Sequence, residues 1–392
     1  MFRKLGEVFT AALKLGLTSF GGPVAHLAYF RKEYVEKRRW LDDDEYARLV
    51  ALGQFLPGPA SSQTGMAIGH RRAGFWGAVA AWAGFTLPSA LLMVAFALLL
   101  KKAPFDFTVL VRGMELVAVA VVAQALLGMG RTLLKGKASI LVVLATVTVL
   151  ALLPSPATPL VILALSALAG VFWFKQSTPN SPSNSGPSQK GGVTIAVVCL
   201  CLFAAGLAAI LGFAVRGGTL VSLAESFYKV GSLVFGGGHV VLPLLKQEVV
   251  TPGWLSADTF LAGYGFAQMV PGPLFSFSAF LGFEIAGWTG AIVALTAIFL
   301  PSLLLVVGVL PFWNRLRSLA RVNGALTAVN AAVIGLLLWA LYDPLGKVAL
   351  QRPADFALAA VLFGLLEVWK LPSWVAVLAG LFGAAALHFG GF

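Results

Sequence analysis

Long apolar stretches limit the possible folds of this chain more than any other feature. Five of them approach the length of about 20 residues that is needed to cross a bilayer. They are residues 78–100, 114–134, 193–215, 291–310 and 324–341. Backbone polar groups in lipid must be hydrogen-bonded within the protein, so spanning segments are helices or closed barrels. Barrel strands would be shorter, alternating segments. The sequence therefore predicts an all-α polytopic integral membrane protein.

Charge and cysteine content agree with this prediction. Charged residues make up 11% of the chain, whereas soluble domains carry about 25%. The net charge of +12 would suggest nucleic acid in a soluble protein, but membrane proteins gather basic residues in cytoplasmic loops. We therefore expect no nucleic-acid partner. Cys199 and Cys201 would point to different sides of a helix, so no disulfide or metal site is expected.

The second half of the chain repeats the first in register. Rare residues recur at a nearly constant spacing along both halves, which indicates an internal duplication. The matches are Lys14 with Lys229, Phe20-Gly21-Gly22 with Phe235-Gly236-Gly237, Glu33 with Glu248, Trp40-Leu41 with Trp254-Leu255, Gln54 with Gln268, Pro57-Gly58-Pro59 with Pro271-Gly272-Pro273, Ala73-Gly74 with Ala286-Gly287, and Leu87-Pro88-Ser89 with Leu300-Pro301-Ser302.

Composition divides the chain into four parts. Residues 1–174 and 217–392 are the two repeats, each with about six apolar segments. Residues 175–192 are rich in Pro, Ser, Asn and Gly, which predicts a flexible linker. Residues 193–216 form an extra linking transmembrane helix without a counterpart, and one additional span would invert the second repeat. The basic connection at residues 31–39 has a counterpart that carries Lys246 alone, and this difference fits inversion. The other loops give no clean alternation of charge, so the sequence does not assign the N-terminus to a side.

Glycine and proline interrupt matching apolar segments of both repeats. Such paired breaks indicate the binding site of a transporter, because freed backbone N–H groups at a restarting helix attract anions. The alternative is that small residues only let helices pack closely. The backbone candidates for substrate binding are Gly21, Gly22, Pro23, Pro57, Gly58, Pro59, Gly236, Gly237, Gly238, Pro271, Gly272 and Pro273. Gly238 stands where the first repeat has Pro23, so the two halves need not be equivalent.

Polar side chains beside the breaks complete the candidate site. Hydroxyls and amides can replace the hydration shell of an anion, although each could instead link two helices. The candidates are Gln54, Ser61, Ser62, Gln268 and Ser276. Lys14 and Lys229 lie inside apolar segments, where lysine is costly and usually functional; Lys14 could also reach the membrane surface.

Four residues could carry protons. His26 and His239 lie just beyond the two breaks, and each could titrate near neutral pH or hold a structural hydrogen bond. Glu33 and Glu248 occupy matching positions, and we favour pairing with basic residues over proton transfer.

Local signals add smaller expectations. Asp42 and Ser256 are expected to cap helices, with Asp42 and Glu45 in a capping-box pattern. Arg112 with Glu115 and Glu367 with Lys370 are spaced to pair near a membrane surface.

The sequence contains no motif of an enzyme. HExxH, a Walker loop and metal-spaced Cys/His clusters are all missing from the sequence. We therefore expect no enzymatic activity, no cofactor or metal, and no direct use of ATP.

Three long motifs resemble one known family. Residues 15–59, "LGLTSFGGPVAHLAYFRKEYVEKRRWLDDDEYARLVALGQFLPGP", are similar to the signature region of the chromate ion transporter family, and "VGSLVFGGGHVVLPLL" with "GFAQMVPGPLFSF" resembles its second copy. The resemblance covers nearly the whole chain, as in long two-domain members.

This resemblance implies a secondary carrier of the bacterial inner membrane that exports chromate, driven by the membrane potential or by protons. The alternatives are a transporter or channel for another small anion such as sulfate, and a membrane enzyme or scaffold. The partners implied are a chromate or sulfate-like oxyanion and the lipid bilayer, with a homodimer left open.

Overall fold

The computed structural model describes residues 2–20, 22–102, 108–134, 136–153, 155, 158–174, 190–212, 218–235, 241–316 and 319–389. Every regular element in these ranges is a helix. Five helices are long and apolar enough to cross a bilayer, within α4 (Ala60–Lys102), α5 (Thr108–Leu133), α8 (Lys190–Gly212), α12 (Phe277–Val309) and α14 (Ala320–Ala340). They cover most of each of the five apolar stretches of the sequence, so the prediction of a multi-pass helical membrane protein is confirmed.

The same order of helices occurs twice. The first series is α1 (Phe2–Thr18), α2 (Gly22–Phe30), α3 (Asp43–Phe55), α4, α5, α6 (Lys137–Leu152) and α7 (Thr158–Trp173), and the second is α9 (Thr219–Leu233), α10 (Val241–Val249), α11 (Ala257–Ala267), α12, α14, α16 (Pro353–Glu367) and α17 (Ser373–Phe389). Helix α8 stands between them without a counterpart. It begins at Lys190, so the last three residues assigned to the linker are helical, while residues 175–189 lie outside the described ranges.

Helices begin and break where the sequence indicates. The Asp42 carboxylate accepts a hydrogen bond from the N–H of Glu45, and the Ser256 hydroxyl accepts one from Thr259. Both are N-caps, as predicted, although the Glu45 carboxylate pairs with Arg71. Helix α1 ends at Thr18 before α2 begins at Gly22, and α9 ends at Leu233 before α10 begins at Val241. We call these two interruptions break 1 and break 2.

Helices α4 and α12 each reverse direction at the same repeated dipeptide. The φ angles are −143° and +67° at Ala73 and Gly74, and −143° and +63° at Ala286 and Gly287. A positive φ suits glycine, which has no Cβ. A Cβ on Gly69 would collide with the carbonyl oxygen of Gly77, so the two parts of α4 lie against each other. Each long helix is therefore two, residues 60–72 and 75–102 in α4 and residues 277–285 and 288–309 in α12.

The first part of each long helix forms a hairpin with the helix before it. In hairpin 1, α3 and residues 60–72 run antiparallel, since Glu45 at one end pairs with Arg71 at the other. Near the turn, a Cβ on Gly53 would lie only 2.7 Å from the carbonyl oxygen of Ala60. Hairpin 2 consists of α11, the 3₁₀ turn η3 (Leu274–Ser276) and residues 277–285. The Pro-Gly-Pro sequences, residues 57–59 and 271–273, are the turns, which we call tip 1 and tip 2.

The two hairpins point in opposite directions along residues 75–102. Hairpin 1 joins the start of this helix through the reversal at Gly74. Hairpin 2 has tip 2 beside Ser89 at the middle, Phe266 stacked on Phe96 at 4.0 Å farther along, and Glu284 paired with Lys101 at 3.3 Å near the end. At 1.5 Å per residue this helix is about 42 Å long. The bases of the hairpins therefore lie about a bilayer thickness apart.

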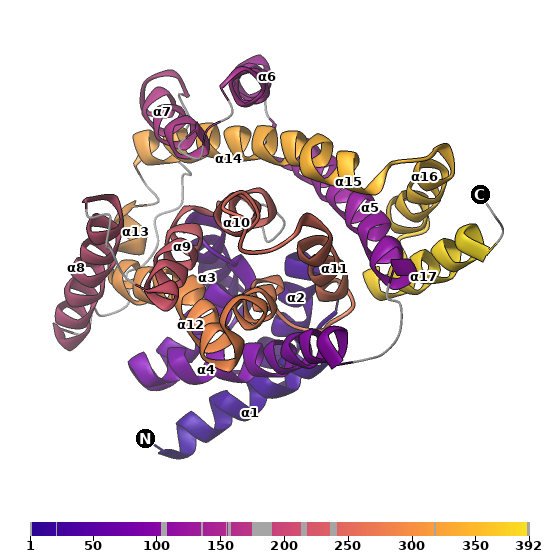
Figure 1. The fold of residues 1–392 in the computed structure, drawn as a ribbon. Helices are drawn as coiled ribbons and strands as arrows, with labels where there is room; N and C mark the ends of the chain where they lie inside the picture. Colours follow the sequence, from indigo (N-terminus) through magenta and orange to yellow (C-terminus); the bar gives the residue numbers. More distant parts are fainter. Residues whose placement is uncertain are drawn as a thin grey trace.

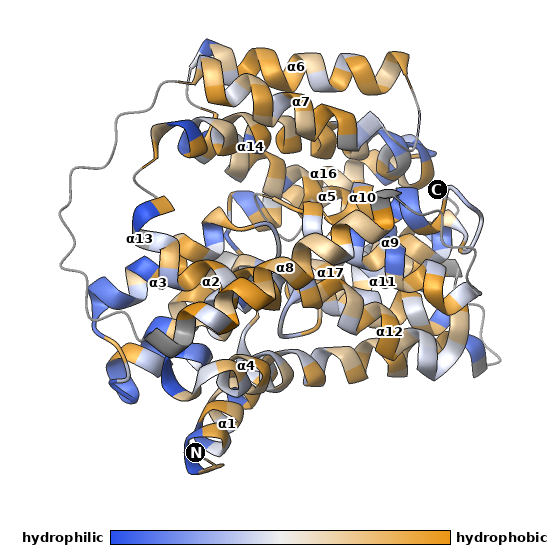
Figure 2. Ribbon diagram, turned by 90° about the vertical axis from the view of Figure 1, so that its left-hand side faces the viewer, coloured by the Kyte–Doolittle hydropathy of each residue, from blue (hydrophilic) through white to orange (hydrophobic). Residues whose placement is uncertain are grey.

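Helices α5, α6, α7, α14, α16 and α17 form an outer layer on one side of a core that contains the two hairpins with α2, α9 and α10. In Figures 1 and 2, α14 lies between the core and the pair α6 and α7, while α1 and the long part of α4 lie on the opposite side of the core. The packing is reciprocal, because α7 lies on α14 as α17 lies on α5. Hydrophilic residues gather toward the two ends of the helices that run across Figure 2, with hydrophobic residues between them. This pattern is typical of a protein that spans a membrane.

Candidate functional site

The tip of each hairpin is hydrogen-bonded to the broken helix of the other repeat. The N–H of Gly58 in tip 1 donates to the carbonyl oxygen of Val234 at break 2, at 2.6 Å. The N–H of Gly272 in tip 2 donates to the carbonyl oxygen of Ser19 at break 1, at 2.9 Å. These two bonds join equivalent residues of the repeats, so a pseudo-two-fold axis passes between them. The two Pro-Gly-Pro turns therefore meet the described edges of the two breaks at this centre.

Glycine is required at both tips. The φ angles are +127° at Gly58 and +102° at Gly272, in the region that other residues rarely adopt. Space is restricted as well, since a Cβ on Gly58 would lie 2.6 Å from Nε2 of Gln63 and still closer to Oγ of Ser302. The glycines let backbone donors reach the partner repeat.

Each tip lies against a serine in the middle of a long helix. Ser89 follows Pro88 in α4, and Ser302 follows Pro301 in α12. Proline removes one backbone hydrogen bond and frees a carbonyl group within the helix. Oγ of Ser89 donates to the carbonyl oxygen of Thr86 at 2.9 Å, and Nε2 of Gln63 lies 3.3 Å from Oγ of Ser302. The repeated Leu-Pro-Ser motif therefore belongs to the centre.

Several buried polar atoms around the centre have no hydrogen-bond partner within the described part of the chain. They are Oγ of Ser19, Oγ of Ser62, Oε1 of Gln63, Oγ1 of Thr86 and Nε2 of Gln268. An unsatisfied buried polar group costs about 1–3 kcal/mol, and native proteins keep few of them without a reason. Four of the five groups can donate to an anion. We call these five residues, with Ser61, Ser89 and Ser302, the central polar cluster.

Helix N-termini add positive potential to the central polar cluster. Helix α4 begins directly after tip 1 and η3 directly after tip 2, while α2 begins at Gly22. Their first N–H groups lack partners in the helix and carry partial positive charge. The cluster itself contains no formally charged side chain. It is therefore suited to a small anion held by dipoles and hydrogen bonds.

His26 lies at the edge of the central polar cluster. Its side chain is buried, with Nδ1 3.2 Å from Oγ of Ser61 and the ring edge-on to Phe85 at 5.4 Å. The imidazole also hydrogen-bonds the backbone of Ser19. Val241 occupies the matching position in the second repeat. The two half-sites therefore differ chemically.

The predicted lysines are paired with the predicted glutamates. Nζ of Lys14 lies 2.8 Å from Glu33, and Nζ of Lys229 lies 2.6 Å from Glu248. Glu33 also accepts from Arg38 at 2.8 Å. These glutamates are thus partners of basic residues, as favoured from the sequence. Each lysine is therefore held in an ion pair, and its part in substrate binding stays a prediction.

The other candidates are divided by burial. Ser61, Ser62, Gln268 and Ser276 are buried beside the tips, whereas Gln54 is exposed and does not join its counterpart Gln268. Gly22 has φ +80° with open space around its Cβ position. Gly21, Gly236, Gly237, Gly238 and His239 lie outside the described residues, as does the side chain of Pro23.

Sequence reasoning missed several residues of the centre. Ser19, Thr86, Ser89 and Ser302 were not candidates, although Ser89 and Ser302 lie in a motif that the duplication had matched. A proline in the middle of an apolar span, followed by serine in both repeats, was the available signal.

Comparisons with known proteins agree with the division of the chain into two repeats. The family model described as "Chromate transporter" matches residues 6–171 and 221–385, one match in each repeat. A protein named "Chromate transport protein" from Pseudomonas aeruginosa is 30% identical over 93% of this chain and 87% of its own length. A protein of the same name from Cupriavidus metallidurans is 29% identical over 94% of this chain and 89% of its own. No solved structure matches significantly.

Proposed function

Because the chain belongs to the chromate transporter family, we propose that it is a secondary carrier that exports chromate across the bacterial inner membrane. The reciprocal bonds between tips and breaks are the observation that supports this proposal most strongly. They surround a buried, uncharged cluster with unused donors, and chromate is a tetrahedral dianion whose oxygens accept several hydrogen bonds. Bonds to a charged acceptor are about twice as strong as neutral ones.

Substrate binding uses donors that the closed structure already holds in place. A chromate oxygen replaces the carbonyl oxygen of Val234 or Ser19 as the acceptor for the N–H of Gly58 or Gly272. The hydroxyls of Ser19, Ser62 and Thr86, together with the amide of Gln268, donate to the remaining oxygens. The full negative charge then strengthens every one of these bonds.

Opposite hairpins provide access from opposite sides. Hairpin 1 and hairpin 2 have their bases at the two ends of residues 75–102, and each tip closes against the other repeat. Withdrawal of one tip opens the centre toward one side while the other tip stays closed. This is alternating access around a fixed site between inverted repeats.

A cluster of basic residues supports a cytoplasmic position for the base of hairpin 1. Arg31, Lys32, Lys37, Arg38 and Arg39 lie in the connection that leads to α3, and such clusters are retained inside. The guanidinium of Arg31 binds Asp43 at 2.7 Å and holds the pKa of that carboxyl below its usual value. The N-terminal end of α1 lies on the same side, because Glu7 pairs with Arg72 at 2.9 Å.

The membrane potential can drive this export without ATP. Moving a dianion out of a negative interior releases about 4.6 kcal/mol per 100 mV, which corresponds to a concentration ratio of roughly 2,000-fold. Proton exchange in the opposite direction would add to this driving force.

Uptake into proteoliposomes tests the proposal. We expect saturable uptake of radiolabelled chromate that an inside-positive potential accelerates and that chromate on the opposite side also accelerates. Flux that neither saturates nor responds to chromate on the opposite side would indicate a channel instead. Uptake equal to that of protein-free liposomes would contradict transport.

Sulfate is the second candidate substrate, because the central polar cluster offers only uncharged donors. Sulfate is also a tetrahedral dianion, so these donors suit it by the same geometry. Competition between labelled chromate and unlabelled sulfate separates the two, and a lower inhibition constant for sulfate would make sulfate the preferred substrate.

A further inference from the structure

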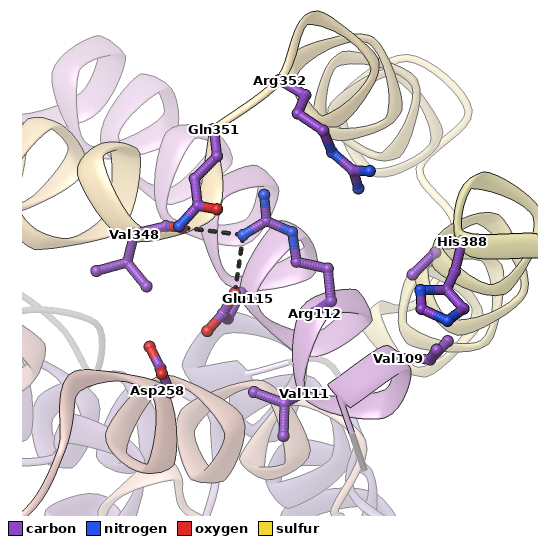
Figure 3. Close-up of a pocket in the computed structure, with 10 residues that line it drawn as sticks. Val109, Val111, Arg112, Glu115, Asp258, Val348, Gln351, Arg352 and His388 are labelled. Carbon is purple, nitrogen blue, oxygen red and sulfur yellow. Dashed lines mark hydrogen bonds and ion pairs between the residues drawn. The ribbon is translucent and has the colours of Figure 1, made fainter. Parts of the chain in front are cut away.

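A cavity of about 510 Å³ lies away from the central polar cluster, between hairpin 2 and the outer layer. Figure 3 shows its charged lining, with Arg112 and Glu115 from α5, Asp258 from α11, Arg352 at the start of α16 and His388 from α17. Arg352 and Asp258 are exposed, so water reaches the cavity. The transport site described above uses none of these residues.

Of the two buried carboxylates here, Glu115 and Asp355, Glu115 has fewer hydrogen-bond and ion-pair partners. Its side chain is 5% exposed, and its ion pair with Arg112 is 3.2 Å long. Arg112 is shared, because it also binds Asp355 and donates to the carbonyl oxygen of Val348 at 2.9 Å. Asp355 receives further bonds from the backbone and side chain of Arg352, and Asp258 is solvated.

Charge around Glu115 favours binding of a proton. Three carboxylates (Glu115, Asp258 and Asp355) face two guanidinium groups (Arg112 and Arg352), so one negative charge is uncompensated unless His388 is protonated. Among the other neighbours of α5, Asp343 of η5 (Leu341–Gly346) is already bound by Lys246 and Lys347. A buried carboxylate within a membrane helix is costly and usually functional.

We propose that Glu115 is the residue that binds the proton exchanged for the exported anion. This inference rests on the proposed function and adds the coupling ion to it. A proton from the water in the cavity adds to a carboxylate oxygen of Glu115, while Asp355 and the carbonyl of Val348 continue to hold Arg112. The cycle is completed when this O–H bond breaks and the proton passes to water on the cytoplasmic side, which restores the carboxylate.

The position of the cavity suits proton uptake from outside the cell. Helix α5 follows the end of α4 at Lys102, and Asp258 lies at the base of hairpin 2. Both therefore lie at the end of the molecule opposite the basic connection of residues 31–39. In the proposed orientation this end faces the periplasm. Asp258 moves with hairpin 2, whereas Glu115 belongs to the outer layer, and Figure 3 shows both carboxylates projecting into the same space. Neutralising Glu115 removes the repulsion between them and lets the base of hairpin 2 approach α5.

Parallel assays of chromate and protons test this inference. Purified protein in liposomes is supplied with chromate, and uptake is recorded with the label while a trapped pH dye records protons. In the native chain we expect chromate to drive proton movement in the opposite direction, with a flux that depends on pH. In Glu115→Gln we expect no chromate-driven proton movement, and the remaining flux no longer varies with pH.

Two further variants and one control variant complete the test. Glu115→Asp retains a titratable group, so we expect proton movement to persist with a shifted pH midpoint, even if Glu115→Gln fails to insert. Asp258→Asn removes the facing charge and should move the midpoint to lower pH. Glu367→Gln is the matched control, because Glu367, like Glu115, is a carboxylate paired with an arginine of α5 (Arg131) but lies outside the cavity.

The outcomes separate the two proposals. Chromate transport without any proton movement in the native chain overturns the role of Glu115 and leaves the proposed function standing. Native proton movement and pH profile in Glu115→Gln also overturn it. Absence of chromate flux in the native chain overturns the proposed function itself.

Discussion

Replacing Gly58 by alanine tests the contact between tip 1 and break 2. The residue has φ +127°, and a Cβ would collide with Oγ of Ser302 and lie 2.6 Å from Nε2 of Gln63. Holding alanine in such a conformation costs about 1–3 kcal/mol. This cost falls on the state in which the N–H of Gly58 reaches the carbonyl oxygen of Val234.

The expected loss follows from this cost. At 1.4 kcal/mol per factor of ten, the equilibrium constant for closing tip 1 falls about 5- to 150-fold. We expect chromate flux in Gly58→Ala to fall within this range at equal membrane abundance. Gly272→Ala should fall less, because its Cβ would meet Oγ of Ser89 at 3.0 Å and the carbonyl oxygen of Phe85 at 3.3 Å, with φ +102°.

The assay is the initial rate of labelled chromate uptake by proteoliposomes at several concentrations, with the protein amount measured in each sample. Gly6→Ala is the matched control, because no atom lies within 4 Å of its Cβ position and its φ is not positive. Adding Ser302→Ala to Gly58→Ala removes the nearest obstacle and leaves the backbone cost, so the double variant separates the two contributions. Native kinetics in Gly58→Ala at native abundance would refute the tip contact as part of the transport cycle.

Four further predictions concern the frame around the site. Gly282→Leu should reduce membrane abundance strongly, because even a Cβ at Gly282 would collide with the carbonyl oxygen of Gly290; abundance on a blot checks this. Lys229→Gln should impair transport by leaving Glu248 unpaired, and adding Glu248→Gln should restore it if the pair is structural; no restoration would indicate direct contact with substrate. Deleting residues 180–188 should leave chromate flux nearly unchanged, and abolished flux with normal insertion would show that the linker is not passive. Single cysteines at Glu36 and Thr251, in a chain without Cys199 and Cys201, should react with an impermeant thiol reagent from opposite sides, and labelling from one side would contradict the inverted repeats.

Much of the frame could be predicted because it depends on local rules. Long apolar runs must be helical in lipid. Asp42 caps a helix with its carboxylate, and Ser256 caps one with its hydroxyl. The duplication located both breaks and both Pro-Gly-Pro turns. The matched Ala73-Gly74 and Ala286-Gly287 pairs were visible as well, yet their role as reversals depends on a positive φ that composition alone does not show.

The membership of the site could be predicted less well because it depends on packing between repeats. Gln54 and Gln268 hold matching places before the two tips, but one is exposed and the other buried. Glu33 and Glu248 were expected to pair with basic residues, but the sequence did not show that Lys14 and Lys229 would be their partners. Which face of a helix meets the other repeat is decided by long-range contacts such as that between Gly272 and Ser19.

Locating bound chromate in the protein is a direct test of a substrate site at the centre. Anomalous X-ray scattering at the chromium edge, from crystals of the purified protein soaked with chromate, places the metal atom of the substrate without assumption. We expect the peak at the centre, with chromate oxygens within hydrogen-bond distance of the N–H of Gly58 or Gly272 and of the hydroxyls of the central polar cluster. A peak only in the cavity beside Arg112, or none within reach of either tip, would show that the central polar cluster is not the substrate site.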